Sequence, residues 1–488
     1  MVEKKKKEYK VVLGALYGDE GKGATVQWLC KREIDNNKKP VVVRFSGGPQ
    51  AGHTVMQHVG DKDLKHICAS LGSGVLLGVD TYLDEQFMLD PIALMAEIDA
   101  LLIELADAGS PLGKDFHPKV WINEWCRIIT PYDIMAGRKD LKVLSDGTCG
   151  KGLYATFKRC QEKFGINPVK KISMFSKENN LREIIKNPQS YLDRVKEYYG
   201  ITEDGQDENA VEWSVKTDYQ AFTPDELDWK FCDAMERISR LMKKDLIKFR
   251  DVDFAVSGLY DTIIYEGSQG LLLDMDNGFM PFCTPSRVGL NGLPRYITSS
   301  QDTEVYLVMR TFLTRHGRGN REKYRIKWPM SYQARILTNK DPWETNEDNS
   351  WQKSFMKGLF DVNLLDQAFS RHKLDNYPVK YNLVVTHADL IDKYIQNRHA
   401  YQPEEGETGG YAYSFQPDYN KSQEKLWTLL NCEGKEIEVA NIQEFIHQVR
   451  CTGDSVYYGK SYNWMCPIER FIETWWSDNP YSEFKRAL

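Results

Sequence analysis

The sequence lacks any run that approaches 18 consecutive apolar residues, and no apolar signal region stands near residue 1. A membrane-spanning helix needs about 18 such residues and a secretory signal needs an apolar segment, so we expect neither. The ten cysteines form no C-x-x-C pair, and the nine histidines show no H-x-x-x-H or H-E-x-x-H pattern. We therefore expect reduced, mostly buried thiols in a cytoplasmic protein, and the spacing does not indicate a zinc site.

An excess of basic charge is also missing. The formal net charge is −6, which argues against nucleic acid as a partner. The one charged run, EKKKKEYK, lies near the N-terminus, and we interpret residues 1–9 as a basic tail. Such a run is a solvated tail or, alternatively, a weak anion-binding arm. What the chain does have is 488 residues of ordinary globular composition, enough to bury a large core.

Apolar runs recur along the chain with helical patterns between them. Several of the runs lack the polar–apolar alternation of a half-buried strand, which favours strands of a buried, largely parallel sheet. The pattern at 90–108 predicts a helix that Asp90 caps and Pro91 begins. We therefore predict an α/β fold. The expected strands are residues 10–16, 40–45, 261–267, 305–312 and 381–392.

Two segments differ from this pattern. Residues 166–250 are rich in charged residues and Tyr, and we interpret them as a helical insertion with helices over 191–200 and 227–249. Residues 396–425 carry Gly, Pro and aromatics, which predicts a long polar surface excursion. The remainder reads as a single domain over residues 10–488.

A glycine-rich loop, Gly18-Asp19-Glu20-Gly21-Lys22-Gly23, follows the first strand and precedes a helical pattern. Glycines let backbone N–H groups approach an anion, the helix N-terminus favours negative charge, and Lys22 adds a cation. The spacing is not that of the ordinary P-loop. Phosphate would repel Asp19 unless a cation lies between them or Asp19 handles a proton. The alternative is a structural turn with exposed acids.

A second glycine loop, RFSGGPQAGHTV, also ends an apolar run. It places His53 at the strand edge where ligands gather in open α/β sheets. A lone histidine is more often structural, but two such loops after successive strands favour a site. Asp19 and His53 facing one another would serve as general base and general acid.

Two further loops join the first two, and four such loops in one chain point to a substrate with several phosphates, or to two phosphorylated substrates. Residues 145–160 and 265–286 are glycine-containing loops, although each alone is as often a plain turn. The run VVTHADLID at 384–392 ends in T-x-x-D, which resembles the base-reading end of guanine sites, where a carboxylate accepts from the ring N–H and the amine. A capped strand end is the alternative for that run.

The order of these motifs resembles the adenylosuccinate synthetase family. That family shows W-G-D-E-G-K-G, then G-G-x-N-A-G-H-T, then E-G-A-Q-G-x-x-L-D-x-D-x-G-x-x-P-x-V-T. This chain has YGDEGKG, GGPQAGHT and EGSQGLLLDMDNGFMPFCT in the same order and spacing. The resemblance covers about residues 10 to 465. It implies a large, mainly parallel sheet with flanking helices, a P-loop-like architecture related to that of GTPases, and here helical insertions.

The resemblance also implies an activity. In that family GTP phosphorylates the 6-oxygen of IMP, and the amine of L-aspartate displaces the phosphate to give adenylosuccinate, in a homodimer that uses Mg²⁺. By motif, Asp19 looks like the base for the purine N1 proton and, with the Gly52 carbonyl, like the Mg²⁺ ligand. His53 resembles the general acid, and Lys22 with the loop amides would hold charge during phosphoryl transfer.

Further site residues are carried over by motif alone. The resemblance implies purine nucleotide contacts from Gln50, Thr148, Cys149, Gln269 and Thr284, with Gln269 also counted among the catalytic residues. A basic residue of the third loop, Lys163 or Arg159 according to register, would reach the partner subunit. The triphosphate site, taking GTP or ATP, would comprise Gly18, Glu20, Gly21, Lys22, Gly23, Thr54, His387, Asp389, Thr452 and Gly453.

Three departures from the family pattern concern substrate choice. Gln50 stands where the family has Asn, and His387 stands where it has Lys. The family's aspartate loop, T-T-G-R-x-R-R-x-G-W, matches SWQKSFMKGLFD, in which only Lys353, Lys357 and Gly358 keep its character. Lysine does not reproduce the bidentate arginine fork. Arg315, Arg318 and Arg321 would compensate or are simply solvated.

Three functions stay open from the sequence. The first is an aspartate-dependent ligase that acts on IMP; relatives that act on (d)GMP typically carry a small hydroxyl residue where Asp19 is retained here. The second is a divergent ligase with another nucleotide or amine. The third is a nucleotide-binding sensor or assembly protein with little turnover.

Overall fold

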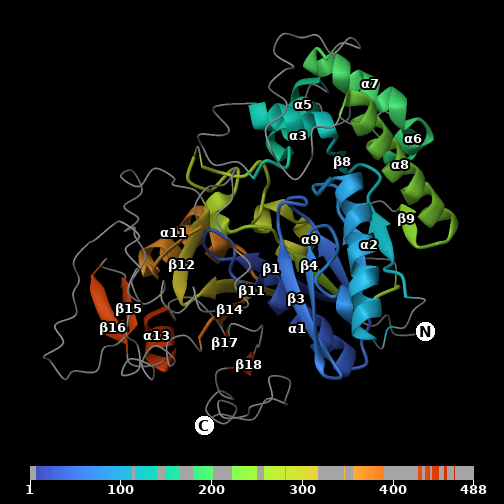
Figure 1. Ribbon diagram of the computed structural model, residues 1–488. Helices are drawn as coiled ribbons and strands as arrows, with labels where there is room; N and C mark the ends of the chain where they lie inside the picture. Colours follow the sequence, from blue (N-terminus) through green and yellow to red (C-terminus); the bar gives the residue numbers. More distant parts are fainter. Residues whose placement is uncertain are drawn as a thin grey trace, which may run out of the picture.

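The computed structural model describes most of the first 388 residues and short segments beyond them (Figure 1). Of the site residues expected above, Thr148, Lys353, Asp389, Thr452 and Gly453 lie outside the described residues, as does the excursion at 396–425. The described residues are 7–110, 112, 116–139, 149–163, 180–201, 223–249, 258–280, 282–316, 346, 355–388, 427–430, 435–439, 442–449, 455–458 and 466–467.

A ten-stranded sheet forms the centre of the fold, in the order β18-β17-β14-β11-β1-β10-β2-β5-β7-β9. All neighbours pair in parallel except β17 and β18 at one edge. The expected large, mainly parallel sheet is thus confirmed. Its strands are β1 (Glu8–Gly14), β2 (Pro40–Arg44), β5 (Asp80–Leu83), β7 (Val120–Ile122), β9 (Ile247–Phe249), β10 (Thr262–Glu266), β11 (Thr303–Arg310), β14 (Lys380–Thr386), β17 (Ser455–Tyr458) and β18 (Cys466–Pro467).

Burial of both faces explains why these strands read as unbroken apolar runs. On β1, Val12 packs with helix α1 (Lys22–Asp35) on one face, while Val11 and Leu13 point into the larger core on the other. Successive strand side chains alternate between faces, so a strand covered on both sides needs apolar residues throughout. The first strand begins at Glu8, so the expected tail of residues 1–9 is two residues too long.

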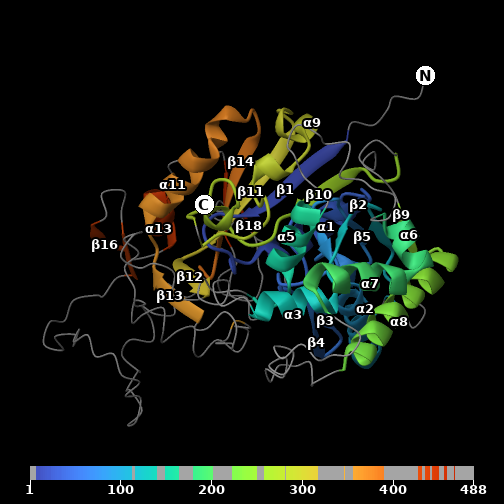
Figure 2. The same ribbon diagram turned by 90° about the horizontal axis from the view of Figure 1, so that it is seen from above.

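Helices cover the sheet on both sides. Asp90 accepts hydrogen bonds from the Ile92 and Ala93 N–H groups and caps α2 (Pro91–Ala108), which confirms the predicted helix and its start. Figures 1 and 2 place α2 and the green helices α6, α7 and α8 at one side of the sheet, and α11 with α13 toward the opposite side. The other helices are α3 (Pro131–Lys139), α5 (Leu153–Lys163), α6 (Leu181–Lys186), α7 (Pro188–Tyr199), α8 (Pro224–Lys243), α9 (Arg295–Thr298), α11 (Val362–His372) and α13 (Ile442–Val449).

The described part of 166–250 contains α6, α7 and α8, and its limits as an insertion stay a prediction. One detail of the expectation is wrong. The helix predicted over 227–249 ends at Lys243, and residues 247–249 form the sheet strand β9 beside β7. The helical pattern of charged and apolar residues continues into this edge strand, so periodicity alone did not separate the two.

Small sheets and 3₁₀ turns surround the main sheet. Two antiparallel strand pairs matter for the site: β3 (His53–Val59) forms a hairpin with β4 (Lys62–Cys68), and β12 (Phe312–His316) pairs with β13 (Phe355–Leu359). The remaining pieces are β6 (Met88–Leu89), β8 (Arg127–Ile128), β15 (Trp427–Leu430), β16 (Glu436–Val439), η1 (Val75–Leu77), η6 (Leu271–Leu273), η7 (Leu290–Gly292) and η8 (Leu374–Asn376).

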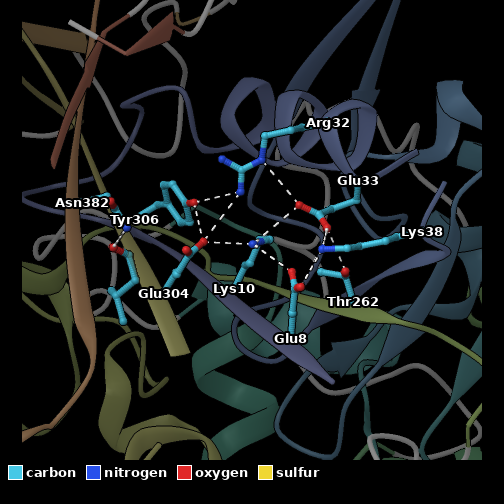
Figure 3. A network of polar contacts seen from close by, with 10 residues as sticks. Glu8, Lys10, Arg32, Glu33, Lys38, Thr262, Glu304, Tyr306 and Asn382 are labelled. Carbon is cyan, nitrogen blue, oxygen red and sulfur yellow. Dashed lines mark hydrogen bonds and ion pairs between the residues drawn. The ribbon is translucent and has the colours of Figure 1, made fainter. Parts of the chain in front are cut away.

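A network of charged side chains joins α1 to the amino ends of three central strands (Figure 3). The Lys10 Nζ lies 2.9 Å from Glu304 Oε2, 3.5 Å from Glu33 Oε1 and 3.6 Å from Glu8 Oε2. Lys10 and Glu33 are buried. A buried cation is tolerated only when opposite charges surround it, so this network fixes α1 against the edge of the sheet opposite to the glycine loops.

Within the part of the chain that the structure describes, every helix is too short or too polar to traverse a bilayer. The seven cysteines among the described residues are free thiols; three of them are buried and four are half-buried, so the expectation of mostly buried thiols holds only in part.

Candidate functional site

Three loops meet at the carboxyl ends of β1, β10 and β2, which are neighbours in the sheet. Their contacts are so close that glycine is required at several points. A Cβ on Gly18 would lie 3.1 Å from the Gln269 Cα, and one on Gly23 would lie 2.8 Å from the His53 Cβ. A Cβ on Gly47 would lie 2.7 Å from the Ser268 Cβ. The structure therefore brings three of the predicted glycine loops into one site.

Asp19 occupies the first loop in the left-handed region, with φ 58°. Its backbone is held from outside the loop, because the Arg310 Nε donates to the Asp19 carbonyl and the Thr314 hydroxyl donates to the Gly18 carbonyl at 3.0 Å. The carboxylate is about 30% exposed, and its Oδ2 lies 3.5 Å from the His316 Nε2. A fixed backbone with an accessible carboxylate suits a group that must meet a ligand.

Glu20 and Lys22 in the same loop are buried. The Glu20 Oε1 accepts from the Leu16 N–H at 2.7 Å, whereas its Oε2 has no hydrogen-bond partner. Burial raises the pKa of Glu20 to about 7, against the opposing effect of Lys22. Burial lowers the pKa of Lys22, with Glu20 as the largest opposing influence. Lys22 is the first residue of α1, so its side chain and the helix N-terminus lie together as an anion site requires.

His53 begins β3 and is locked to Glu266, the last residue of β10. The His53 Nδ1 lies 2.5 Å from Glu266 Oε1, and the same carboxylate accepts from the Ser73 hydroxyl and from the Ser73 N–H at 3.0 Å. Burial lowers the pKa of His53 to about 4, although Glu266 opposes the change. The carboxylate therefore orients the ring, with Nδ1–H toward Glu266 and Nε2 available to another group.

Two glutamine amides at the site lack partners. Neither amide atom of Gln50 has a hydrogen bond, and the Oε1 of Gln269 is likewise buried and unpaired. Gln269 also holds a positive φ of 54°. Buried polar atoms without partners cost about 1–3 kcal/mol each. Unpaired amide atoms beside this loop are available to a ligand, and the purine nucleotide contacts expected of both residues stay predictions.

A divalent cation of the Mg²⁺ class suits the oxygen donors of this site. Mg²⁺ prefers carboxylate and carbonyl oxygens and usually keeps several waters. Asp19 offers an accessible carboxylate and Gly52 an exposed backbone. The donor chemistry fits, and the pairing of Asp19 with Gly52 at one ion stays a prediction.

Arg159 differs from its expected role. Its guanidinium is buried and forms a fork with Asp133 at 2.7 and 3.0 Å, and it also donates to the Tyr191 hydroxyl and the Ile128 carbonyl. All these partners belong to its own chain, so this arginine is an internal structural residue and does not point to another subunit. Lys163 ends α5 and stays the candidate, although its side chain lies outside the described residues.

The structure also describes four other expected site residues. Thr54 lies in β3, Cys149 is half-buried, and the Thr284 N–H bonds to the Leu273 carbonyl at 2.7 Å. His387 follows β14 in the left-handed region with φ 59°. Their nucleotide contacts stay predictions.

The antiparallel pair of β12 and β13 carries basic residues near the first loop. Arg315 is buried and its guanidinium lies 4.8 Å from the Tyr17 ring centroid, so it is not a solvated charge. Lys357 is buried as well, in β13. Arg318 and Arg321 lie outside the described residues.

Several functional candidates escaped the sequence reasoning. Glu266 is the partner of His53, yet it lies 213 residues away in the chain. Arg44 at the end of β2 is fully buried and donates to the Leu71 carbonyl at 2.9 Å, while its Nε and Nη2 have no partner. Arg310 and His316 hold or face Asp19. The usable signal was their position at strand ends, since polar residues that close apolar runs lie at the ligand edge.

Comparison with known proteins gives the same family throughout. A family model described as adenylosuccinate synthetase matches residues 11–394. The adenylosuccinate synthetase of Nitrosomonas europaea is 30% identical over 283 residues, which is 57% of this chain and 55% of that protein. That of Clostridium kluyveri is 30% identical over 322 residues, 63% of this chain and 64% of that protein. The chain thus spans less than two thirds of the length of these relatives.

Two solved structures overlay on the chain. A fully ligated adenylosuccinate synthetase from Plasmodium falciparum covers 78% of this chain and 77% of its own, with a TM-score of 0.49 and 20% identity. The succinoaminodeoxyadenylate synthetase of cyanophage S-2L, solved with dGMP and dATP as an energy donor, covers 81% and 90%, with a TM-score of 0.46 and 15% identity. The family model covers most of the residues that build the sheet and its three loops. The chain belongs to the adenylosuccinate synthetase family.

Proposed function

We propose that this chain is a purine nucleotide ligase. It uses GTP or ATP to phosphorylate the 6-oxygen of IMP or a related purine monophosphate, and L-aspartate then displaces that phosphate to give adenylosuccinate. One arrangement carries the proposal: the buried His53–Glu266 pair lies against the glycine loop that presents Asp19. An acid and a base meeting on a phosphate-binding loop are what phosphorylation of a purine oxygen needs.

Asp19 has the part of general base. It removes the N1 proton of the purine, and the charge moves to O6, which attacks the γ-phosphorus while the nucleoside diphosphate leaves. The aspartate amine then attacks C6, loses a proton, and expels phosphate. Mg²⁺, when bound, supplies charge neutralisation for the phosphates. The accessible carboxylate on a backbone fixed by Arg310 and Thr314 supports this part, because a base must reach its proton without reorganising.

His53 has the part of general acid at the transferring phosphoryl group. Protein groups alone leave it neutral, since burial holds its pKa at about 4. The negative phosphates of a bound triphosphate act in the opposite direction and favour the imidazolium. Glu266 then stabilises the charged ring through Nδ1–H while Nε2–H faces the phosphate. The acid is therefore formed when the nucleotide arrives.

A second candidate is a ligase of the same chemistry with another nucleotide, such as (d)GMP, or another amine donor. The sequence of the matching aspartate loop motivates it, because SWQKSFMKGLFD lacks the arginines that clamp a dicarboxylate. Gln50, one methylene longer than the family's Asn, also shifts the nucleotide contact. Retention of Asp19 supports a 6-oxopurine without a 2-amino group, which keeps IMP first.

A product assay separates these candidates. The purified protein is incubated with Mg²⁺, GTP or ATP, each of (d)IMP and (d)GMP, and aspartate, and products are identified by mass. We expect an adenylosuccinate-type product that Asp19→Asn abolishes and that Asp35→Asn, at an exposed surface pair, leaves intact. Phosphate release without aspartate incorporation contradicts the first candidate and supports another amine. No product with any combination supports a nucleotide-binding sensor or assembly protein.

Assembly and location extend the proposal. We expect a homodimer in which Lys163 reaches the partner's nucleotide, and a cytoplasmic protein with no nucleic-acid or membrane partner. Sedimentation of the purified chain tests the dimer, and Lys163→Met is expected to weaken monophosphate binding without changing the sedimentation coefficient.

A further inference from the structure

A cluster of three possible metal ligands lies behind the His53 strand, where β4 packs on α2. His66 and Cys68 stand two residues apart in β4, so both point to the same side of the hairpin, toward Glu97 of α2. All three are buried, and one ligand atom from each lies within 4.8 Å of the others. None of the three belongs to the glycine loops or to the groups assigned to substrate.

The histidine of this cluster has one nitrogen engaged and one without a partner. The His66 Nδ1 lies 2.6 Å from Glu104 Oε2, and Glu104 stands on the same face of α2 as Glu97, two turns later. The Nε2 is buried, has no hydrogen-bond partner, and lies 3.8 Å from Glu97 Oε1. A histidine whose outer nitrogen donates to a carboxylate, with the inner nitrogen facing other ligands, is the usual second-shell arrangement of a metal-bound imidazole.

The Glu97 carboxylate already accepts hydrogen bonds from three backbone N–H groups and still has a lone pair that can bind an ion. Its Oε1 accepts from the Ala69 and Leu71 N–H groups, both at 3.0 Å, and its Oε2 accepts from the Ser70 N–H at 2.6 Å. A carboxylate has about four lone-pair sites, so a further one is available on Oε2. Cys68 completes the set, and its Sγ makes a long contact of 3.7 Å with the Gly72 carbonyl.

We propose that His66, Cys68 and Glu97 bind one divalent cation of the zinc class. An imidazole, a thiolate and a carboxylate are ligands that Zn²⁺ accepts together, and the thiolate disfavours Mg²⁺ and Ca²⁺. Tetrahedral bonds of about 2.0–2.3 Å place ligand atoms roughly 3.5 Å apart, and the three candidate ligand atoms here lie within 4.8 Å of one another before any ion is bound. The H-x-C spacing in a strand, with the third ligand from a helix, escapes the sequence patterns that failed to indicate zinc.

Charge and protons balance on binding. The cation meets one thiolate and one carboxylate, so the buried centre is neutral. Zinc binds the deprotonated thiolate, so binding releases the Cys68 thiol proton to solvent.

A cation at this site would rigidify the segment that holds His53, the proposed general acid, in position. Cys68 pairs directly with His53 across the hairpin, and the segment after Cys68 runs through Leu71 to Ser73, which donates to Glu266. Glu97 anchors the start of that segment. The cation thus supports the position of His53 from behind and has no contact with substrate, which makes it independent of which purine nucleotide the chain accepts.

Metal content and cobalt spectroscopy test the proposal on the full chain. Purified protein is expected to carry about one zinc per chain by elemental analysis. After chelation and addition of Co²⁺ alone, we expect a thiolate-to-cobalt charge-transfer band with the visible bands of a tetrahedral ion. Zn²⁺ is expected to remove the bands by competition. The Asp19→Asn variant, which alters the expected Mg²⁺ site, is expected to keep them.

Variants assign the ligands. Cys68→Ser is expected to remove the charge-transfer band, and His66→Gln and Glu97→Gln to weaken cobalt binding at least tenfold. His58→Gln, at an exposed histidine of the same hairpin, and Cys30→Ser, at a buried cysteine of α1, are expected to change nothing. Absence of zinc together with no cobalt bands in the wild-type chain refutes the site and leaves His66 as a structural contact of Glu97 and Glu104. A cobalt band that survives Cys68→Ser refutes it equally.

Discussion

Replacing Glu20 by glutamine is expected to stabilise the ligand-free chain at alkaline pH. Glu20 is fully buried, and glutamine keeps the oxygen that accepts from the Leu16 N–H while it removes the unpaired charge on Oε2. Burial raises the pKa of Glu20 from 4.5 to about 7. Because the folded pKa is the higher one, the contribution of Glu20 to stability is present below pH 4.5 and is lost as the pH rises through about 7.

The interval between these pKa values sets the magnitude. From 4.5 to about 7 is about 2.5 pH units, and at 1.36 kcal/mol per unit the full loss is about 3 kcal/mol. Between about pH 5 and about pH 8.5 the wild type should lose about 2–3 kcal/mol relative to Glu20→Gln, because part of the titration is complete at the lower pH. For 488 residues the unfolding entropy is about 1 kcal/mol/K, so the relative Tm change is about 2–3 °C.

The assay compares Tm and urea unfolding of the two proteins at both pH values without nucleotide. Glu236→Gln is the control, because Glu236 is exposed and pairs with Arg240 on the surface of α8, and its effect should stay under about 0.5 kcal/mol. A stability difference between wild type and Glu20→Gln that is the same at both pH values refutes the reasoning. It would mean that Glu20 is already ionised in the folded chain at the lower pH.

Three other changes have expected outcomes. Glu266→Gln should lower kcat about 10²-fold with little change in KM, since it loses the charge that stabilises the His53 imidazolium; an unchanged kcat in steady-state kinetics contradicts that role. Lys10→Met should lower the free energy of unfolding by about 3 kcal/mol in urea, because the buried Glu33 loses a neighbouring cation. The control Lys31→Met, which removes an exposed ion pair, should cost under about 1 kcal/mol. Equal effects of the two variants would contradict a stabilising role for the network. Gly270→Ala should lower both Tm and nucleotide affinity, because its Cβ would lie 2.5 Å from the Gly18 nitrogen and closer still to the Leu16 carbonyl oxygen. The control Gly137→Ala, whose Cβ would have its nearest neighbour at 3.6 Å, should be neutral or stabilising. Similar Tm values for the two variants would contradict the close loop packing.

The sheet was predictable because a strand that is buried on both faces appears in the sequence as a continuous apolar run, and each strand shows this signal by itself. The runs at 40–45 and 261–267 became β2 and β10 almost to the residue, and Asp90 with Pro91 marked the start of α2. The edge strand β9 was not predictable from the sequence. Its three residues follow a helix and are too few to show that the hydrophobic periodicity changes from that of a helix to that of a strand.

Within the site, the sequence predicted the motif residues but could not predict which residues they pair with. Asp19, Lys22 and His53 stand beside glycines in short loops, so local spacing and family resemblance both indicated them. Glu266 could be placed at the end of a strand, but its pairing with His53 depends on which strands become neighbours, and that is a property of the whole sheet. The role expected of Arg159 was wrong for the same reason. Arg159 pairs with Asp133 because α5 packs on α3, and this packing cannot be read from local sequence.

The position of β1 has a consequence for how the chain is made. β1 leaves the ribosome long before both of its sheet neighbours: Lys10 pairs with Ile264, 254 residues downstream (264 − 10), and with Glu304, 294 residues downstream. At about 5–20 residues per second, synthesis leaves this apolar strand without its neighbours for roughly 13–50 s. During that time its edges are open to other nascent chains. Expression of this protein should therefore depend on chaperone supply and gain solubility when translation is accelerated between residues 40 and 310.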